Sequence, residues 1–280
     1  MKIIENKNFP SERALYNSSD VLLRNCTFEG EEDGESALKE SRNVRLDNCR
    51  MDLRYPLWHD STVELFECEM TENCRAPLWY SENVRIRSCR LHGVKALREC
   101  RDAEFYDTEI VSPEFGWRNR GIVMENCSVT GEYAFFSSSD IKLKGIKFSG
   151  KYSFQYVENL VIEDSFLDTK DAFWHAKNVT VRNSVVNGEY LGWYSEGLTL
   201  ENCKIKGTQP LCYCRGLRLV DCETEAADLS FEYSDVDADL KGNVVSVKNP
   251  RSGRIVADSI GEIILTDDSV YPCECEIKVR

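Results

Sequence analysis

Cysteine and histidine are the residue types in this chain best suited to chemistry, and their spacing limits what they can do. The chain has 13 cysteines and 3 histidines among 280 residues. Cys212 and Cys214 are separated by one residue, as are Cys273 and Cys275. Four thiolates can hold zinc tetrahedrally, so the two pairs are weak candidates for a metal site if the C-terminal residues fold back on the preceding chain. The alternative is that both pairs are inert.

A group of carboxylates near a histidine is the second candidate for chemistry. Asp168, Asp171 and Glu189 lie near His175 and Tyr194, and a carboxylate beside an imidazole can transfer protons. Acidic side chains in loops are, however, usually solvated and without such a role. The sequence contains no phosphate-binding loop, dinucleotide fingerprint, zinc-protease motif or hydrolase elbow. We therefore expect no cofactor, assign no catalytic residue and favour a protein that is not an enzyme.

Charge and composition exclude several classes of partner. The chain has 35 basic and 48 acidic side chains, a net charge of −13, which repels nucleic-acid phosphates and anionic lipid headgroups. We therefore expect neither nucleic acid nor membrane as a partner. No apolar run approaches the roughly 18–20 residues that cross a bilayer, and the first residues lack the apolar core of a secretory signal. Together with the odd number of cysteines, this predicts reduced thiols and a cytoplasmic location.

These residues are set in a repeat of 19 residues. One series of positions is apolar throughout: Val21, Val44, Val63, Val84, Ala103, Ile122, Ile141, Leu160, Val179, Leu198, Leu217, Val236 and Ile255. A second apolar series follows two positions later and ends at Ala238 and Ala257, and most of the cysteines form a third. The register breaks only near Glu29–Glu35 and Thr71–Arg75, where residues are inserted.

The repeat predicts a parallel β-helix. Apolar residues two positions apart have the spacing of a β-strand, and Asn, Asp and Gly at the intervening positions are typical of sharp corners. Each repeat is therefore expected to form three short strands and three corners, a coil that is stabilised by stacking on its neighbours. The absence of a six-residue subperiod favours a right-handed helix. We expect one all-β domain over 1–280 with about thirteen coils: an N-terminal cap at 1–13, regular coils at 14–241, and degenerate coils with a C-terminal cap at 242–280.

One side of each coil contains the aromatic residues. A single series includes all five tryptophans, the residue before it is mostly Leu or Phe, and the residue after it is often Tyr, His or Glu. In a strand, neighbouring side chains point to opposite faces, so the tryptophans either stack in the core or form an outer ladder. Small neighbouring residues favour burial, but Arg98 and Gln155 of the same series would then lie unpaired in the core at a considerable cost. The sequence leaves both orientations open.

Either orientation places aromatic area on the outside, where we expect any ligand to bind, since continuous apolar surface tends to mark an interaction site. The candidate binding residues are Tyr156, Trp174, His175, Trp193, Tyr194 and Tyr213. Three interpretations remain: a stacked structural layer without a ligand, a platform for carbohydrate, or an interface with another protein or a second copy of the chain. The alternative to a binding or scaffold protein is a lyase or hydrolase acting on saccharides.

The repeat units also resemble those of a known family. The segments APLWYSENVRI at 76–86 and GEYLGWYS at 188–195 resemble a bacterial β-helix family defined as a domain of unknown function, number 3737. The resemblance extends over nearly the whole chain and implies a pectate-lyase-like fold. It implies no activity and supplies no catalytic residues.

Overall fold

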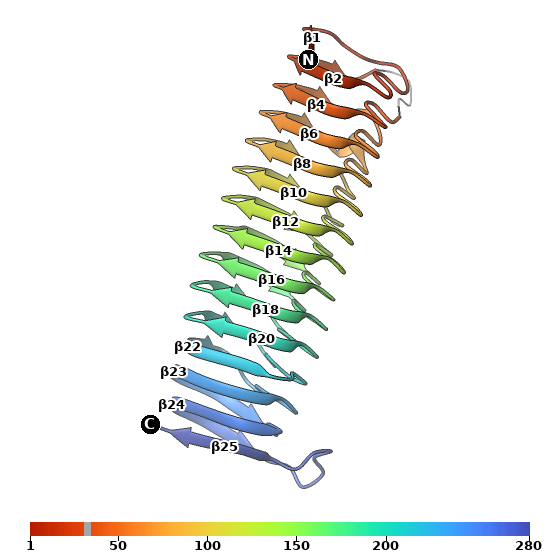
Figure 1. Ribbon diagram of the computed structural model, residues 1–280. Helices are drawn as coiled ribbons and strands as arrows, with labels where there is room; N and C mark the ends of the chain where they lie inside the picture. Colours follow the sequence, from red (N-terminus) through yellow and green to blue (C-terminus); the bar gives the residue numbers. More distant parts are fainter. Residues whose placement is uncertain (31–34) are drawn as a thin grey trace. The chain divides into compact units, whose positions relative to one another are not determined.

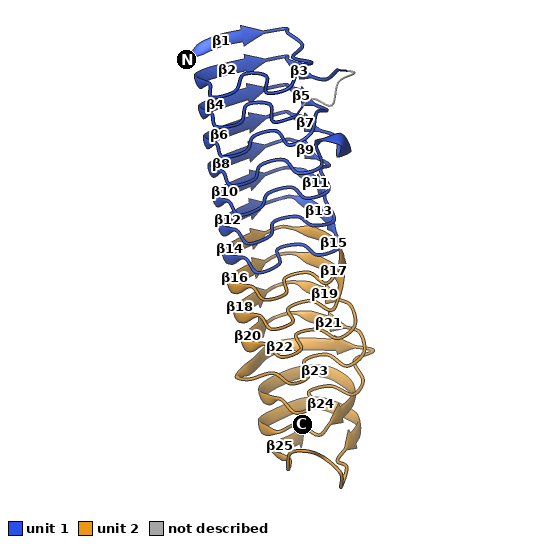
Figure 2. Cartoon of the chain, turned by 90° about the vertical axis from the view of Figure 1, so that its right-hand side faces the viewer, with its two compact units in different colours: residues 1–141 blue, residues 142–280 orange. Residues whose placement is uncertain are grey.

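The computed structural model, which describes residues 1–30 and 35–280, is a parallel β-helix of stacked coils, as the repeat predicts (Figure 1). The insertion expected near Glu29–Glu35 lies largely outside the described residues. The chain divides into two compact units, residues 1–141 and 142–280 (Figure 2). Each is built from the same coil, and no helix in the described part of the chain is long and apolar enough to cross a membrane.

Unit 1 has two strand-forming sides. The first holds β1 (Lys2–Glu5), β2 (Ser19–Arg24), β4 (Arg42–Asp47), β6 (Ser61–Phe66), β8 (Glu82–Arg87), β10 (Arg101–Tyr106) and β12 (Arg120–Glu125). The second holds β3 (Thr27–Phe28), β5 (Arg50–Met51), β7 (Glu69–Met70), β9 (Arg90–Leu91), β11 (Glu109–Val111) and β13 (Ser128–Gly131). The insertion at Thr71–Arg75 forms a short 3₁₀ helix, η1 (Glu72–Cys74). The apolar series stack in register, as in the pairing of Val44 with Val21 and Val63.

Unit 2 continues the same arrangement after β14 (Ser139–Lys144), which contains the boundary between the units. Its first strands are β15 (Lys147–Lys151), β16 (Glu158–Glu163), β17 (Phe166–Lys170), β18 (Lys177–Arg182), β19 (Val185–Asn187), β20 (Glu196–Glu201) and β21 (Lys204–Lys206). The last four are β22 (Leu217–Glu225), β23 (Asp235–Lys248), β24 (Ser252–Ile264) and β25 (Glu274–Val279). β23 and β24 run through a corner without interruption.

The expected register fails by two residues in β24. Leu217 pairs with Val236 as the period predicts, but Val236 then pairs with Gly253 and Ile255 with Ala238. The coil between these pairs is therefore 17 residues long (253 − 236). Its shortening accompanies an irregularity between Leu240 and Asn243 in the pairing of β23 with β24. Ile255 remains buried in the core despite the shift.

The third side of the coil differs from the strand expected there. Its residues alternate into the left-handed region, as at Leu57 and His59, which both have φ of 59°. Leu57 is fully buried, while Trp58 is half-buried and His59 is exposed. The strict in-and-out alternation of a strand is lost, so two neighbouring side chains face outward. The tryptophan series and the series that follows it therefore both lie on the outside.

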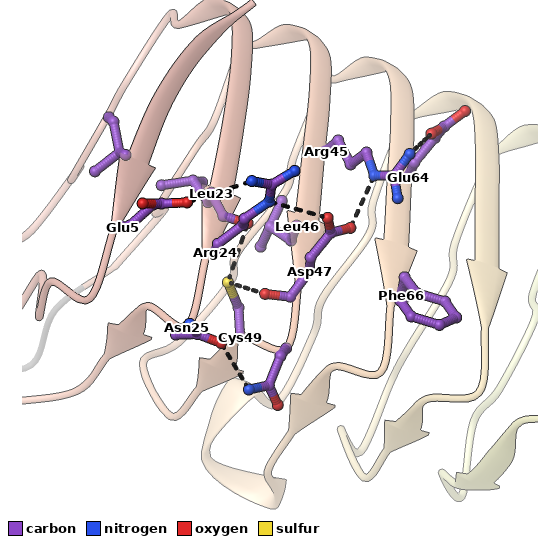
Figure 3. A network of polar contacts seen from close by, with 12 residues as sticks. Glu5, Leu23, Arg24, Asn25, Arg45, Leu46, Asp47, Cys49, Glu64 and Phe66 are labelled. Atoms are coloured by element: carbon purple, nitrogen blue, oxygen red, sulfur yellow. Dashed lines mark hydrogen bonds and ion pairs between the residues drawn. The ribbon is translucent and has the colours of Figure 1, made fainter.

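Polar pairs connect successive coils on the outer face of the first side (Figure 3). The side chain of Arg24 lies 3.3 Å from Glu5 and 3.6 Å from Asp47. Arg45 lies 3.9 Å from Glu64 of the next coil and 2.8 Å from Asp47 of its own strand. Exposed pairs of this kind each contribute less than about 1 kcal/mol, so the buried apolar stacks supply most of the stability.

Candidate functional site

The tryptophans of the third side join coils together. In unit 2 the rings of Trp174 and Trp193 stack with centroids 5.3 Å apart and planes 4° apart. The indole N–H of Trp174 donates to the carbonyl of Tyr190 (2.7 Å), and that of Trp193 to the carbonyl of Gln209 (2.8 Å). Each tryptophan thus satisfies a backbone group of the next coil, which indicates a structural role for this series.

Two polar members of the tryptophan series confirm that it faces outward. The guanidinium of Arg98 lies 4.6 Å from the ring centroids of both Trp79 and Trp117, and it pairs with Glu114 at 2.7 Å. The side-chain amide of Gln155 donates to a backbone carbonyl of the next coil in unit 2 (3.2 Å), as the indoles do. Both side chains therefore find partners on this side of the coil, although Nε of Arg98 is buried without a hydrogen-bond partner among the described residues.

The residues that follow the tryptophan series form a second stack, here named the Tyr/His ladder: Tyr156, His175, Tyr194 and Tyr213. Successive ring centroids are 4.9, 5.0 and 4.7 Å apart, and successive planes differ by 11°, 8° and 13°. Neighbouring rings therefore cover one another's faces. Ring edges, phenol hydroxyls and imidazole nitrogens are the groups left to meet a ligand along this ladder.

Parallel stacking ends at the C-terminal end of the Tyr/His ladder. The ring of Tyr233 is inclined by 55° to that of Tyr213, and Tyr271 is inclined by 77° to Tyr233. A pocket of about 280 Å³ lies there. This ladder pocket is lined by His175, Tyr194, Glu196, Tyr213, Arg215, Tyr233, Arg251 and Tyr271.

Hydrogen-bond donors dominate the chemistry of the ladder pocket. Burial, with the nearby charge of Glu232, raises the pKa of Tyr213 to about 12, so its phenol keeps its proton at neutral pH. The guanidinium of Arg251 lies 3.6 Å from Asp235 and 5.2 Å from the ring centroid of Tyr271. Arg215 makes no ion pair with an acidic side chain of the described residues, which leaves its guanidinium available to a ligand.

The six predicted binding residues fall into two groups on one side of unit 2. Trp174 and Trp193 form the structural stack, and the other four form the Tyr/His ladder, of which His175, Tyr194 and Tyr213 line the pocket. Sequence reasoning missed the remaining pocket residues: Glu196, Arg215, Tyr233, Arg251 and Tyr271.

Tyr233 had a detectable signal. The segment FEYS at 231–234 aligns with LCYC at 211–214 after 20 residues instead of 19, and a buried apolar residue, Leu211 or Phe231, stands two positions before each tyrosine. Tyr271 lies between β24 and β25, outside the repeat, so no periodic signal in the sequence identifies it.

Two of the three carboxylates expected near His175 are paired with other side chains. Asp168 accepts a hydrogen bond from the amide of Asn187 (2.7 Å), and Glu189 pairs with Lys170 (2.9 Å). Asp171 is buried, and that burial raises its pKa. None of the three lines the ladder pocket, where Glu196 is the carboxylate.

The structure does not bring the two cysteine pairs together as metal ligands. Cys212 and Cys214 are buried, while Cys273 is exposed. The thiol of Cys214 donates to the carbonyl of Gly192 (3.1 Å), and burial raises its pKa to about 11. Across residues 1–30 and 35–280, no group of three or more His, Cys, Asp or Glu side chains could hold a metal ion.

The sequence matches the model of one protein family over nearly its whole length. The model of DUF3737, a protein family of unknown function, matches residues 2–278. The chain belongs to the DUF3737 family. No curated protein matches the sequence.

Several solved structures are similar over most of the chain. A surface adhesin of Streptococcus pneumoniae, PfbA, is 12% identical, with 89% of this chain and 70% of the adhesin covered and a TM-score of 0.39. The A-module of a mannuronan C-5 epimerase from Azotobacter vinelandii is 11% identical, with 98% of this chain and 89% of the module covered and a TM-score of 0.33. These values are too low to support an assignment of function.

Proposed function

We propose that this DUF3737 protein binds carbohydrate in the ladder pocket and has no catalytic activity of its own. The observation that carries the proposal is the pocket lining, where tyrosines, an imidazole, two guanidinium groups and one carboxylate gather. A sugar presents an apolar ring face surrounded by hydroxyls. Aromatic rings and a dense set of hydrogen-bond donors and acceptors together complement such a ligand.

The geometry favours binding of a sugar at the C-terminal end of the Tyr/His ladder over binding along the ladder. A sugar stacks on an aromatic face, and within the ladder neighbouring rings already cover those faces. At Tyr233 and Tyr271 the ring planes turn, so faces and hydroxyls border the same space. A volume of about 280 Å³ lies near the lower end of ligand pockets, roughly 300–1,000 Å³. It fits one or two sugar units at the end of a chain better than a continuous polymer.

The proposal is tested by thermal unfolding with oligosaccharides. Cellohexaose, chitohexaose and a hexauronate serve as probes, and we expect one of them to raise the melting temperature. At a hundred times the dissociation constant, binding stabilises a fold by about 2.7 kcal/mol. Tyr271→Ala and Arg215→Ala should each abolish the shift, because they remove a ring and a free guanidinium from the pocket.

Two positions in unit 1 provide matched controls. Tyr80 stacks on His59 at 4.8 Å and 16°, much as Tyr194 stacks on His175, and Arg101 opens β10 much as Arg215 precedes β22. Tyr80→Ala and Arg101→Ala should leave the ligand-induced shift intact. No shift with any probe, or a shift that survives both Tyr271→Ala and Arg215→Ala, would contradict the proposal.

A saccharide-active enzyme is the second candidate function. It is favoured by the presence of Glu196 and His175, a carboxylate and an imidazole, in the same pocket as Arg215. Incubation of each probe with the protein, followed by measurement of new reducing ends and unsaturated products, distinguishes the two candidates. Turnover that disappears in Glu196→Gln would replace the binding proposal, while binding without turnover supports it.

A further inference from the structure

One edge of strand β25 has no partner strand in the part of the chain that the structure describes. β25 pairs in parallel with β24. The backbone N–H of Glu274 donates to the backbone carbonyl of Arg251 (2.8 Å), and the backbone N–H of Arg280 donates to the backbone carbonyl of Ala257 (3.0 Å). Because the backbone groups of a parallel strand alternate between its two edges, residues 274, 276, 278 and 280 bond to β24. The groups directed to the other edge belong to the residues between them: Cys275, Ile277 and Val279.

The charges on β25 are arranged symmetrically about Ile277 with opposite signs. Glu276 precedes it and Lys278 follows, and the next charged residues outward are Glu274 and Arg280. If two copies of β25 met in antiparallel fashion with Ile277 opposite Ile277, Glu276 would face Lys278. Glu274 would face Arg280, whose guanidinium already pairs with two aspartates of its own chain. Opposite charges at facing positions stabilise a strand pair, and like charges destabilise it.

Only this register matches all the charges. Centring the pair on Glu276 would place Glu276 against Glu276, and centring it on Lys278 would place Lys278 against Lys278. Centring it on Cys275 would place Glu274 against Glu276, and centring it on Val279 would place Lys278 against Arg280. A register shifted by one residue would place facing side chains on opposite faces of the sheet. The same register also places the unpaired backbone groups of residues 275, 277 and 279 opposite one another, as hydrogen-bonded antiparallel pairs require.

Exposed apolar side chains occur on β25 and in the residues that precede it. Val279 of β25 is 56% exposed, as is Leu265, which follows β24, and Val270 is 73% exposed. Ile263 of β24 is also exposed. An exposed apolar side chain on an unpaired strand, as at Val279, is typical of a surface that is covered by a partner.

We propose that two copies of this chain associate through the free edge of β25, paired antiparallel with Ile277 on a two-fold axis. Such an interface is self-complementary, as a symmetric dimer requires. Charges on an edge strand ordinarily prevent such pairing. Here Glu276 and Lys278 of one copy, already 2.6 Å apart, would join the same two residues of the second copy in a cluster of four alternating charges. The proposal is independent of the carbohydrate proposal.

Sedimentation equilibrium of the full chain tests the dimer through its charges. The wild type should show a monomer–dimer equilibrium. Glu276→Lys and Lys278→Glu each convert two attractive pairs per dimer into repulsive ones, so each should raise the dimer dissociation constant roughly tenfold or more. In an equimolar mixture, the Lys residues of the first variant face the Glu residues of the second, and the mixture should regain wild-type affinity.

Two results would overturn the proposal. One is a wild type that stays monomeric up to about 100 μM, because its dissociation constant would then be too high for specific association. The other is a dimer that neither variant weakens, which would place the interface elsewhere. Equal melting temperatures of the wild type and both variants would show that the folds are intact.

Cross-linking provides a second test that does not depend on charge. In a Cys273→Ser/Cys275→Ser background, Ile277→Cys places two thiols opposite each other across the axis, close enough for a disulfide. We expect a covalent dimer on mild oxidation. Ile263→Cys in the same background is the control, because an exposed thiol away from the axis should cross-link far less. Equal cross-linking of the two variants would contradict the register.

Discussion

At the scale of single residues, Asp60 is the most unusual side chain of the molecule. It is 2% exposed and lies at the corner that follows the exposed aromatic series. One carboxyl oxygen accepts a hydrogen bond from the backbone N–H of Ser41 (2.7 Å), while the other has no partner among the described residues. Burial raises the pKa of Asp60 to about 8. Between about pH 4 and pH 8, the carboxyl group of Asp60 is therefore protonated in the native protein and ionised in the unfolded chain.

This residue should make stability depend on pH. The native pKa of about 8 lies above the unfolded value of about 3.9, so the native state binds the extra proton between these values. The contribution of Asp60 is fully present below about pH 4 and is lost as pH rises towards 8. Asp60→Asn should remove that loss and raise the free energy of unfolding at pH 8 by about 2 kcal/mol. Urea unfolding at pH 5 and pH 8 measures both effects.

Asn119, three coils later, shows how an amide fits this position. Its side-chain oxygen accepts from the backbone N–H of Cys100 (2.7 Å), and its side-chain N–H₂ donates to the carbonyl of Leu97 (3.0 Å). Asp267→Asn, at an exposed position, is the control and should change neither stability nor its pH dependence. An unchanged pH profile in Asp60→Asn would show that the carboxyl is not the cause.

At the scale of the elements, close stacking of coils restricts certain corners to glycine. At Gly188, where φ is 152°, an added Cβ would lie 1.8 Å from the carbonyl oxygen of Thr169 in the preceding coil. Gly188→Ala should therefore lower the free energy of unfolding by about 3 kcal/mol, since the backbone of two coils must move apart. Denaturant titration measures this change.

Gly242 is the matched control for this corner. Its φ of 73° is also positive, but an added Cβ would meet nothing within 4 Å. Gly242→Ala should cost only about 1 kcal/mol, the conformational penalty alone. Similar losses for the two variants would mean that the spacing between coils is not what limits Gly188.

The two strand-forming sides were predictable from the sequence, and the third side was not. Val44, Leu46 and their equivalents alternate with charged residues, which is sufficient to predict a half-buried strand. On the third side, left-handed conformations fall on Leu57 and Tyr80, residue types that carry no such preference. The alternation of a strand was therefore the wrong basis for orienting the tryptophans.

The candidate site was predictable to the extent that it follows the repeat. His175, Tyr194 and Tyr213 follow one another at intervals of 19 residues and were identified on that basis. Tyr271 reaches the pocket from the segment between β24 and β25. Its position depends on how that segment folds, for which no periodic signal exists.

At the scale of the whole molecule, stability should be distributed coil by coil. In a solenoid each repeat contacts only its neighbours, so a complete coil should be removable. Leu160 and Val179 occupy the same position of successive coils in unit 2. Deletion of residues 158–176 should therefore leave a folded protein that unfolds cooperatively, with a moderately lower melting temperature by circular dichroism.

A deletion that is one residue shorter is the control. Removing residues 158–175 shifts the following strand by one position, which exchanges its buried and exposed side chains. This variant should be unfolded or aggregated. If both deletions behave alike, the coil is not the unit of stability.

The positions of the tryptophans also determine what intrinsic fluorescence reports about this molecule. Trp58, Trp79 and Trp117 belong to unit 1, Trp174 and Trp193 to unit 2, and all five lie on the third side of the coil. Intrinsic fluorescence will therefore follow the detachment of that side in either unit and will not register events confined to the strands. Substituting the tryptophans of one unit by phenylalanine would give an emission signal that belongs to the other unit alone.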